Sequence, residues 1–403
     1  METGDGMMMK TARPGRRVLW IFLGGMLLLV LLGASLVPGM VARRMNPVVG
    51  RPLPALTAET RRIHASLMVA DLHGDVLLWD RDLLERSASG HIDVPRMREG
   101  RVGIQAFTAV TKTPKKMNIE SNSGDSDNVT LLAVLQGWPV GTWGSLAERA
   151  LHQAGKLHAT EVRGEGALVV LETRSDLEDF LAARAGDPDV VAGFLGIEGT
   201  HALEGDLANV DRLFGAGYRM FGLTHFFDNA VGGSAHGVEK GGLTAFGAAV
   251  LARMDELGIL VDLAHASPPL MDDALARATR PVVVSHGGVK GTCDNRRNVS
   301  DAHLRAIAAT GGVMGVGLWA TALCGETPAD WARAVRHAVE VMGVDHVALG
   351  SDWDGAVRAI VDAAGTAHLV QALLDEGFAA DDIVKIMGGN VVRVLGEVLP
   401  TGG

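Results

Sequence analysis

The sequence lacks a surplus of positive charge. Its formal net charge is −10 at pH 7, and no long run of like charges occurs along its 403 residues. Because nucleic-acid-binding proteins normally present a basic face, this balance argues against a nucleic-acid partner. The 52 glycines are dispersed rather than periodic, which indicates tight turns and argues against a fibre or a long linker. Apolar residues make up 47% of the chain, which is enough for a sizeable core.

Cysteine is scarce, and Cys293 and Cys324 are the only two. They lie about thirty residues apart, so they could pair in an oxidising compartment. Two unrelated buried thiols are the alternative. Neither cysteine lies near the N-terminus, which excludes a lipoprotein-type acylated cysteine there. The C-terminal residues lack the hydrophobic tail that precedes a glycolipid anchor, so we expect none.

One long apolar run is present. Residues 18–37 include no charged side chain, and four cationic residues precede them within the first 17 positions. A run of this length can span a bilayer as a helix, and the preceding cations favour a cytoplasmic N-terminus. We predict a cytoplasmic tail over 1–17, a membrane anchor over 18–40 and a tether over 41–57, with the remainder on the exported side, periplasmic or extracellular. A cleaved signal peptide is the alternative and would give a secreted protein.

Beyond the tether, short apolar runs alternate with amphipathic stretches. Such runs are typical of buried parallel strands. The eight expected strands are 67–71, 102–110, 190–197, 218–224, a run ending at His265, a run ending at His286, 311–318 and 346–350. A short extra strand is expected at 167–172, and helices fill the intervals, including 328–342 and 380–398. The simplest architecture that accounts for this alternation is an α/β fold, a (β/α)8 barrel over residues 58–400.

Six of the eight expected strands end in histidine, aspartate or glutamate. The carboxyl ends of barrel strands are where catalytic sites are built. A carboxylate at the end of an apolar strand is costly to bury without a partner, and a metal ion would satisfy it. The residues at these strand ends are His73, Asp75, Glu198, His225, His265, His286 and Asp352.

Five of these residues form a plausible ligand set. His73, Asp75, Glu198, His265 and His286 provide three imidazoles and two carboxylates. Nitrogen and oxygen donors without thiolate suit Zn²⁺, with Mn²⁺, Co²⁺ or Fe²⁺ as alternatives. Five ligands are too many for one tetrahedral zinc with an open position. They suit two ions bridged by Glu198, one on the His73 side and one on the His265 side, which can share a hydroxide and lower its pKa towards neutrality.

These motifs resemble those of the membrane dipeptidase (renal dipeptidase) family, zinc peptidases of the amidohydrolase superfamily. The resemblance covers about residues 60–395. The matching motifs are His73-Gly74-Asp75, Gly196-Ile197-Glu198-Gly199-Thr200-His201, Leu223-Thr224-His225, Val261-Asp262-Leu263-Ala264-His265-Ala266-Ser267, Val284-Ser285-His286, Arg296-Arg297-Asn298-Val299 and Gly350-Ser351-Asp352-Trp353-Asp354-Gly355.

The resemblance implies a barrel enzyme that hydrolyses dipeptides with a hydroxide bridging two zinc ions. It implies that the five ligands hold the ions as described, with Glu198 between them. His225 and Arg297 match substrate-contacting positions. We therefore expect His225 to stabilise the oxyanion, Arg297 to bind the C-terminal carboxylate of the substrate and Asp352 to handle the proton. Neighbouring Arg296 is expected to form a surface salt bridge, and the sequence leaves a homodimer open.

The chain departs from the family pattern in places. The first motif commonly reads Asp-Gly-His-Asn-Asp, whereas Leu72 and Gly74 stand at its second and fourth places. Residues 111–144 are expected to form a loop over the site and the start of a helix that continues through Leu157. The region near 111–165 matches no family pattern, so no side-chain preference is predicted. In some members a cysteine shortly after the second-zinc histidines pairs with one about thirty residues on, which implies a Cys293–Cys324 disulfide.

Two other functional hypotheses compete with that of a dipeptidase. One is a different amidohydrolase-type activity, such as a lactonase, a phosphotriesterase or an N-acyl-amino-acid deacylase. The other is a non-catalytic, membrane-tethered binding protein on an inactive barrel. Loss of a ligand would favour the latter, yet every expected ligand is present in the sequence.

Overall fold

Parallel strands and intervening helices make up residues 14–402, the range that the computed structural model describes, apart from several side chains of the first helix. The predicted tail over 1–17 lies mostly outside this range. The strands are β1 Val69–Gly74, β2 Val102–Val110, β3 Leu168–Val170, β4 Val191–Glu198, β5 Tyr218–Gly222, β6 Leu260–Asp262, β7 Val283–Gly287, β8 Val313–Val316 and β9 Val347–Leu349.

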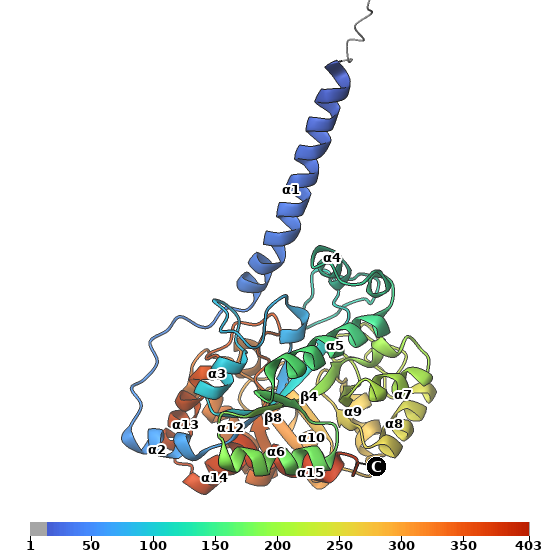
Figure 1. The fold of residues 1–403 in the computed structure, drawn as a ribbon. Coiled ribbons are helices and arrows are strands. Elements are labelled where there is room, and N and C mark those ends of the chain that lie inside the picture. Colours follow the sequence, from blue (N-terminus) through green and yellow to red (C-terminus); the bar gives the residue numbers. More distant parts are fainter. Residues whose placement is uncertain (1–13, 403) are drawn as a thin grey trace, which may run out of the picture.

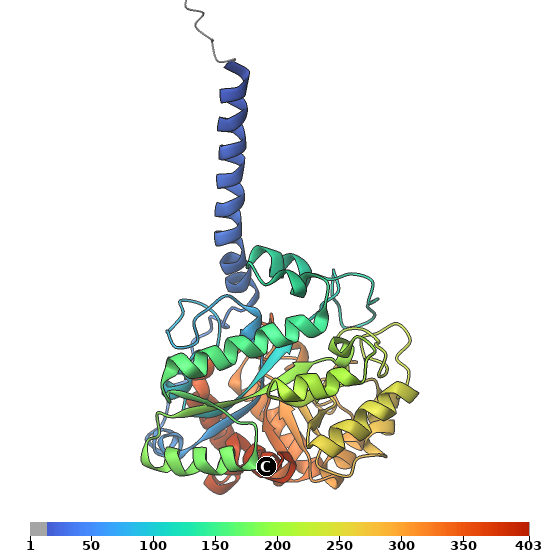
Figure 2. The same ribbon diagram turned by 45° about the vertical axis from the view of Figure 1, so that its right-hand side comes forward.

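The α-helices lie between and around these strands, as Figures 1 and 2 show. They are α1 Pro14–Met45, α2 Ala58–Ser66, α3 Val94–Glu99, α4 Val129–Leu135, α5 Leu146–Gly164, α6 Arg174–Gly186, α7 Ala208–Gly215, α8 Ala245–Leu257, α9 Pro268–Leu275, α10 Asp301–Ala309, α11 Ala320–Leu323, α12 Pro328–Met342, α13 Thr366–Asp375, α14 Ala380–Val384 and α15 Asn390–Val398.

Eight of the strands close into a parallel barrel. Their order is β2-β1-β9-β8-β7-β6-β5-β4, and β2 also pairs with β4, from Ile104 beside Ala192 to Val110 beside Glu198. The short strand β3 pairs only with the start of β4 among the described strands, Leu168 lying beside Val191. The predicted (β/α)8 barrel and its extra strand are therefore confirmed.

Local sequence explains where α12 begins and why it packs. Thr327 caps the helix, Asp330 completes a capping box, and Pro328 occupies the first turn, where its missing N–H costs nothing. Buried Trp331 then donates its indole N–H to the carbonyl of Val316 in β8. The helix extends over the predicted 328–342.

The predicted helix over 380–398 is wrong in one respect, because a π-helical turn at Lys385–Gly389 divides it into α14 and α15. This turn lies directly against the entry to β1. A Cβ at Gly388 would stand 2.1 Å from the carbonyl oxygen of Met68, so no side chain fits there. The Asn390 amide then donates to the carbonyls of Val344 and Val347, which anchors α15 beneath β9.

A disulfide joins two loops at the same end of the barrel. Cys293 lies in the segment after β7, and Cys324 directly follows α11, after β8. The pairing that the family resemblance implies is confirmed, and the alternative of two unrelated thiols is wrong. The bridge constrains the loop that carries Arg297.

Helix α1 includes the predicted membrane segment. Within residues 14–402, no helix combines the length and the apolar character needed to cross a membrane. The predicted anchor therefore gains no support from the structure. The C-terminal end of α1 lies beside α4 in both views of the molecule (Figures 1 and 2). There Ala42 packs in an apolar cluster with Trp79, Val110 and Trp138.

Candidate metal centre and substrate pocket

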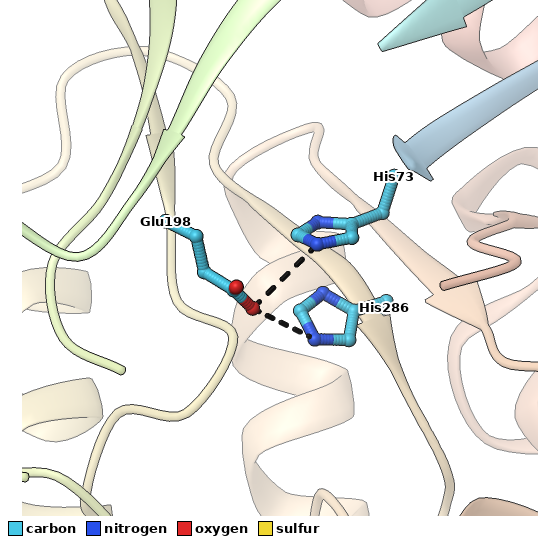
Figure 3. A group of neighbouring side chains, drawn as sticks. All are labelled: His73, Glu198 and His286. Carbon is cyan, nitrogen blue, oxygen red and sulfur yellow. Dashed lines mark ion pairs between the residues drawn. The ribbon is translucent and has the colours of Figure 1, made fainter. Parts of the chain in front are cut away.

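The predicted ligands meet at the carboxyl ends of the barrel strands. His73 lies near the end of β1, Glu198 is the last residue of β4, and His286 lies in β7. Figure 3 shows these three side chains pointing toward one another from separate strands. Asp75 follows β1 and His265 follows β6, and all five side chains are buried.

Glu198 stands at the centre of the group. Its Oε1 lies 3.5 Å from His73 Nε2, 3.2 Å from His265 Nε2 and 3.5 Å from His286 Nε2. Its Oε2 lies 3.2 Å from His225 Nε2. One carboxylate therefore faces four imidazoles.

The ligand atoms gather into three overlapping groups. Within each group these atoms lie no more than 4.8 Å apart. Glu198 belongs to two groups, and His73 also belongs to two. The groups are His73, Glu198 and His286; Glu198, His225 and His265; and His73, Asp75 and Asp352. His225 thus lies within the ligand cluster, beside the predicted second ion, and its role as a substrate contact stays a prediction.

A serine hydroxyl orients two of the histidines. Ser285 Oγ donates to Asp262 Oδ2 at 2.6 Å and lies 3.0 Å from His73 Nδ1 and 2.9 Å from His286 Nδ1. Because its single proton goes to Asp262, the oxygen can only accept from the two Nδ1–H groups. Both Nε2 atoms are then turned toward the ligand cluster, as metal-binding imidazoles require.

The converging imidazole nitrogens fit a metal site. His73 Nε2 is buried without a hydrogen-bond partner among the described residues, 3.5 Å from carboxylate oxygens of both Asp75 and Glu198. His265 Nε2 and His286 Nε2 face each other at 3.0 Å. Lone pairs that converge in this way among carboxylate oxygens suit a divalent cation such as Zn²⁺.

The electrostatics of the cluster also favour a cation. Desolvation raises the pKa of Glu198 well above its ordinary value, and the Asp75 carboxylate adds to the shift. Desolvation raises the pKa of Asp352 to about 8. Burial alone lowers the pKa of His73, but the carboxylates of Asp75 and Glu198 raise it to about 10. Without a bound cation, the buried carboxylates therefore attract protons to themselves and to His73. Bound dications would supply the positive charge that these protons supply in their absence.

The imidazoles of His265 and His286 are neutral. Desolvation lowers the pKa of His265 and His286 well below the ordinary value, and Arg297 contributes in the same direction. A neutral imidazole is the form that binds a metal ion.

Backbone strain marks two of the site residues. His265 has φ +63° and Asp352 has φ +60°, in the left-handed region that non-glycine residues rarely adopt. Strain of this kind persists where the surroundings fix it and is concentrated at functional sites.

A cavity of about 250 Å³ opens over the cluster. Thr113, Met117, Asn118 and Ile119 form part of its wall, so the predicted loop over the site is confirmed. Ligand-cluster residues and substrate-contact candidates also line it: Asp75, Glu198, His225, His265, His286, Arg297 and Asp352. A hollow of about 290 Å³ between α8 and α9 is lined by none of them and lies away from the chemistry.

Arg297 reaches the cavity, whereas its neighbour does not. Buried Arg297 donates from Nη2 to the carbonyl oxygen of His286 at 2.9 Å, and its guanidinium lies 5.7 Å from the Trp319 ring. Exposed Arg296 instead pairs with Glu120 at 2.7 Å on the surface. The expectation of a surface salt bridge for Arg296 is confirmed.

Residues 57–401 match the sequence profile of the family described as membrane dipeptidase (peptidase family M19). The chain belongs to the membrane dipeptidase family. The resemblance inferred from the motifs is thereby confirmed.

Two relatives of this member of the membrane dipeptidase family are fungal proteins. The dipeptidase aclJ of Aspergillus oryzae is 27% identical over 352 residues, which cover 82% of this chain and 78% of the relative. The dipeptidase verJ of Clonostachys rogersoniana is 27% identical over 316 residues, covering 76% of each chain.

Two solved structures show the same fold. One is a metallopeptidase from Rhodobacter sphaeroides liganded with a phosphinate mimic of the dipeptide L-Ala-D-Ala. It aligns with a TM-score of 0.67 at 24% identity, over 82% of this chain and 99% of that one. The other is the probable dipeptidase PvdM from Pseudomonas aeruginosa, with a TM-score of 0.70 at 18% identity, over 85% of this chain and 98% of that one.

The structure explains one departure from the dipeptidase family's first motif. A Cβ at Gly74 would lie 2.4 Å from Ile92 Cδ1 and 2.9 Å from Gln105 Nε2. Ile92 and Gln105 therefore occupy the space that an asparagine side chain would need. A larger residue at this place would require the ends of the Ile92 and Gln105 side chains to move.

Two further histidines support the pocket without joining the ligand groups. His201 lies 3.0 Å from Thr111 Oγ1 and packs on Phe227. Burial lowers the pKa of His201 to about 3, so its ring is neutral. His236 stacks on Phe226, which lines the cavity.

Sequence reasoning assigned no role to the polar residues behind the ligands. Thr108 donates to Asp75 Oδ1 at 2.5 Å, and Asp71 accepts from the Ser351 hydroxyl at 2.7 Å. Asp262 and Ser285 orient the imidazoles. A signal existed, because each is a polar side chain inside an apolar strand run or at its end, and buried polar groups require partners.

Ser285→Ala should weaken metal binding by about 10- to 100-fold, because loss of a hydrogen-bond partner behind metal-binding histidines has that typical cost. Competition against a zinc chelator of known affinity measures the change. Ser66→Ala is the matched control, since its hydroxyl bonds only locally, to Ile63 in α2. Unchanged zinc affinity in Ser285→Ala would show that the hydroxyl does not orient the ligands.

Proposed function

We propose that the chain is a zinc-dependent dipeptidase. The observation that carries the proposal is the buried Glu198 carboxylate facing four imidazoles at the mouth of the barrel. Membership of the membrane dipeptidase family supports the same activity, as do the dipeptidase names of its relatives. The related Rhodobacter metallopeptidase with its dipeptide mimic supports a substrate of that size.

Five side chains would hold two zinc ions in this proposal. His73 and Asp75 serve one ion, His265 and His286 the other, and Glu198 both. Bound zinc would supply a hydroxide near neutral pH and polarise the scissile carbonyl. The donor set of nitrogen and oxygen atoms fits this assignment, and so does the orientation of the imidazoles by Ser285.

Asp352 and His225 would perform the remaining chemistry at the peptide bond. The Asp352 carboxylate lies with His73 and Asp75 in one group of ligand atoms, so it can receive a proton there and return it to the leaving amine. The His225 imidazole lies at the cavity wall, where it can donate to the oxygen that becomes negative during the reaction.

Arg297 would select very short peptides. Its guanidinium is buried beside the ligand cluster, so a substrate carboxylate paired with it lies close to the scissile bond. The cavity of about 250 Å³ is smaller than the roughly 300–1,000 Å³ usual for drug-sized ligands, which agrees with a dipeptide.

The purified chain should contain about two equivalents of zinc, and Glu198→Gln should lose both metal and turnover, because a neutral amide balances two dications poorly. Elemental analysis after gel filtration measures the metal. Exposed Glu239→Gln is the control and should keep both ions. Full activity with one tightly held ion would contradict the two-ion proposal.

Arg297→Ala should lower kcat/KM on free dipeptides by about 10- to 100-fold, since a hydrogen bond to a charged group contributes roughly 1.5–3 kcal/mol. The zinc content should not change. Dipeptide amides should be poor substrates of the wild type and should lose little more in the variant. Arg296→Ala, the exposed neighbour, should behave as wild type.

An equal loss on free dipeptides and on their amides would show that Arg297 does not bind the carboxylate. That result would favour a more general amidohydrolase activity. A panel that includes D-configured C-terminal residues would define the preferred substrate.

We also propose that the barrel acts outside the cytoplasm, held by residues 18–40 or released by their cleavage. The Cys293–Cys324 disulfide supports this location, because such bonds persist in oxidising compartments. Cell fractionation should place the full-length chain with membranes, or a chain starting near residue 40 in the exported soluble fraction. Intact full-length chain in the cytosol would refute the proposal.

A further inference from the structure

The residues that follow α1 are bound to the rim of the substrate cavity. Asn46 is buried at 2% exposure, and its Oδ1 accepts the backbone N–H of Ala356 at 2.8 Å. Its amide nitrogen donates back to the carbonyl of Ala42 at 3.0 Å. One side chain therefore joins the end of the N-terminal helix to a loop far along the sequence.

That loop contains the residue proposed to handle the proton. Asp352 begins it, and Gly355, Ala356 and Val357 line the cavity. Ala356 has φ +60°, a left-handed conformation that is unfavourable for alanine. A residue strained in this way keeps its conformation only where its surroundings hold it. The bond from Asn46 acts directly on the N–H of this strained residue.

A second contact extends the connection to the arginine side of the cavity. Val49 donates to the carbonyl of Ala359 at 2.8 Å, and Ala359 donates to that of Pro47 at 3.2 Å. Ala359 forms a parallel bridge with Val48 and an antiparallel bridge with Trp319. Residues 46–49 are thus one edge of a small ribbon whose other edge is Trp319.

Trp319 in turn faces Arg297, proposed to bind substrate, and His286, proposed to bind metal. Its ring lies 5.7 Å from the Arg297 guanidinium and 5.8 Å from the His286 ring. A displacement of Ala359 would therefore be transmitted to Trp319 and to the position of Arg297. The N-terminal segment contacts both walls of the cavity through the backbone of one loop.

Apolar packing places Asn46 independently of these hydrogen bonds. Ala42, one turn before it, is buried among Trp79, Val110 and Trp138, and Val41 packs against the same cluster. Val110 and the adjacent Leu78 line the cavity. The last turn of α1 is therefore a fixed support from which Asn46 can hold the loop.

We propose that Asn46 is a positioning residue for the substrate cavity, acting through Ala356 on the loop that carries Asp352. This inference rests on the proposed dipeptidase function for its kinetic consequence, but not for the contact itself. Removing the Asn46 amide leaves the Ala356 N–H without its partner and frees the strained loop to relax. Alignment of Asp352 with the scissile bond is then lost.

The test compares Asn46→Ala, Asn46→Asp and the control Arg44→Ala in the full-length, zinc-loaded chain. Asp keeps an oxygen acceptor for the Ala356 N–H, whereas Ala does not. Arg44 is exposed two residues earlier in α1. Asn46→Ala should lower kcat on a good dipeptide by about tenfold, because the relaxed loop would no longer hold Asp352 in line with the scissile bond. Zinc content should not change, Asn46→Asp should recover part of the rate, and Arg44→Ala should match wild type.

Hydrogen–deuterium exchange provides a readout that needs no substrate. Peptides covering 352–360 should exchange faster in Asn46→Ala than in wild type or Arg44→Ala, while peptides covering β4 and β7 should not change. Wild-type exchange in 352–360, or wild-type kcat in Asn46→Ala, would overturn the proposal. So would an equal loss of rate in Asn46→Ala and Asn46→Asp with a matching fall in unfolding temperature, because that pattern reports a general loss of stability.

The two proposals fail in distinguishable ways. If no dipeptide is hydrolysed by the wild-type zinc enzyme, the proposed function is wrong, while the exchange comparison still tests the Asn46 contact. If wild type is active and Asn46→Ala equals it in both readouts, the positioning role is wrong and the dipeptidase function stands.

Discussion

A carboxylate buried among imidazoles governs the mouth of this barrel. Glu198 is only 4% exposed, and a charge taken out of water at such a position is costly unless neighbouring groups compensate it. The strands that surround it supply those groups. β1 brings His73 and β7 brings His286, while the turns after β5 and β6 bring His225 and His265. The parallel barrel makes this possible, because it ends all its strands at one edge.

The free-energy cost of burying the Glu198 carboxylate is offset by hydrogen bonds behind the ligand residues as well as by contacts between them. Ser285 uses its proton on Asp262 and its oxygen on two imidazoles, so each partner is satisfied and each ring is held. Asp71 serves β1 and β9 in the same way by accepting both the N–H and the hydroxyl of Ser351. The Ser285–Asp262 bond joins the neighbouring strands β7 and β6, and the Ser351–Asp71 bonds join the end of β9 to its neighbour β1. The register of the barrel and the geometry of the site therefore depend on the same contacts.

The loops that complete the cavity are tied down from outside the barrel. The disulfide holds the segment that carries Arg297, and the N-terminal segment holds the segment that carries Asp352. The loop with Asp352 contains strained backbone conformations, and the loop with Arg297 contains a buried charge. Each loop would change its conformation if the contacts that hold it were lost. A rigid β-barrel by itself would position the metal ligands but would leave the substrate-binding walls unsupported.

Local sequence predicted much of this protein. Apolar runs of strand length predict the eight barrel strands, because a strand buried on both faces needs apolar side chains on both. The ligands could be predicted because they are polar residues at the ends of those runs. Helix α12 follows from Thr327, Pro328 and Asp330, whose capping chemistry acts within a few residues. The π turn before α15 could not be predicted in this way, because it packs against the backbone of Met68, more than three hundred positions earlier, and no local pattern reports that contact.

Only the tertiary structure decided which residues that are distant in the sequence come into contact. Arg296 and Arg297 are adjacent and chemically identical, and only the path of the loop directs one to Glu120 on the surface and the other to the cavity. Ser285 and Asp262 look like ordinary strand residues until the barrel brings them behind His73. Asn46 lies in what the sequence presents as a tether, and only folding brings its amide to Ala356. The sequence determined which chemical groups are available, whereas barrel closure and loop packing determined which of them meet, because those contacts join segments that no local pattern connects.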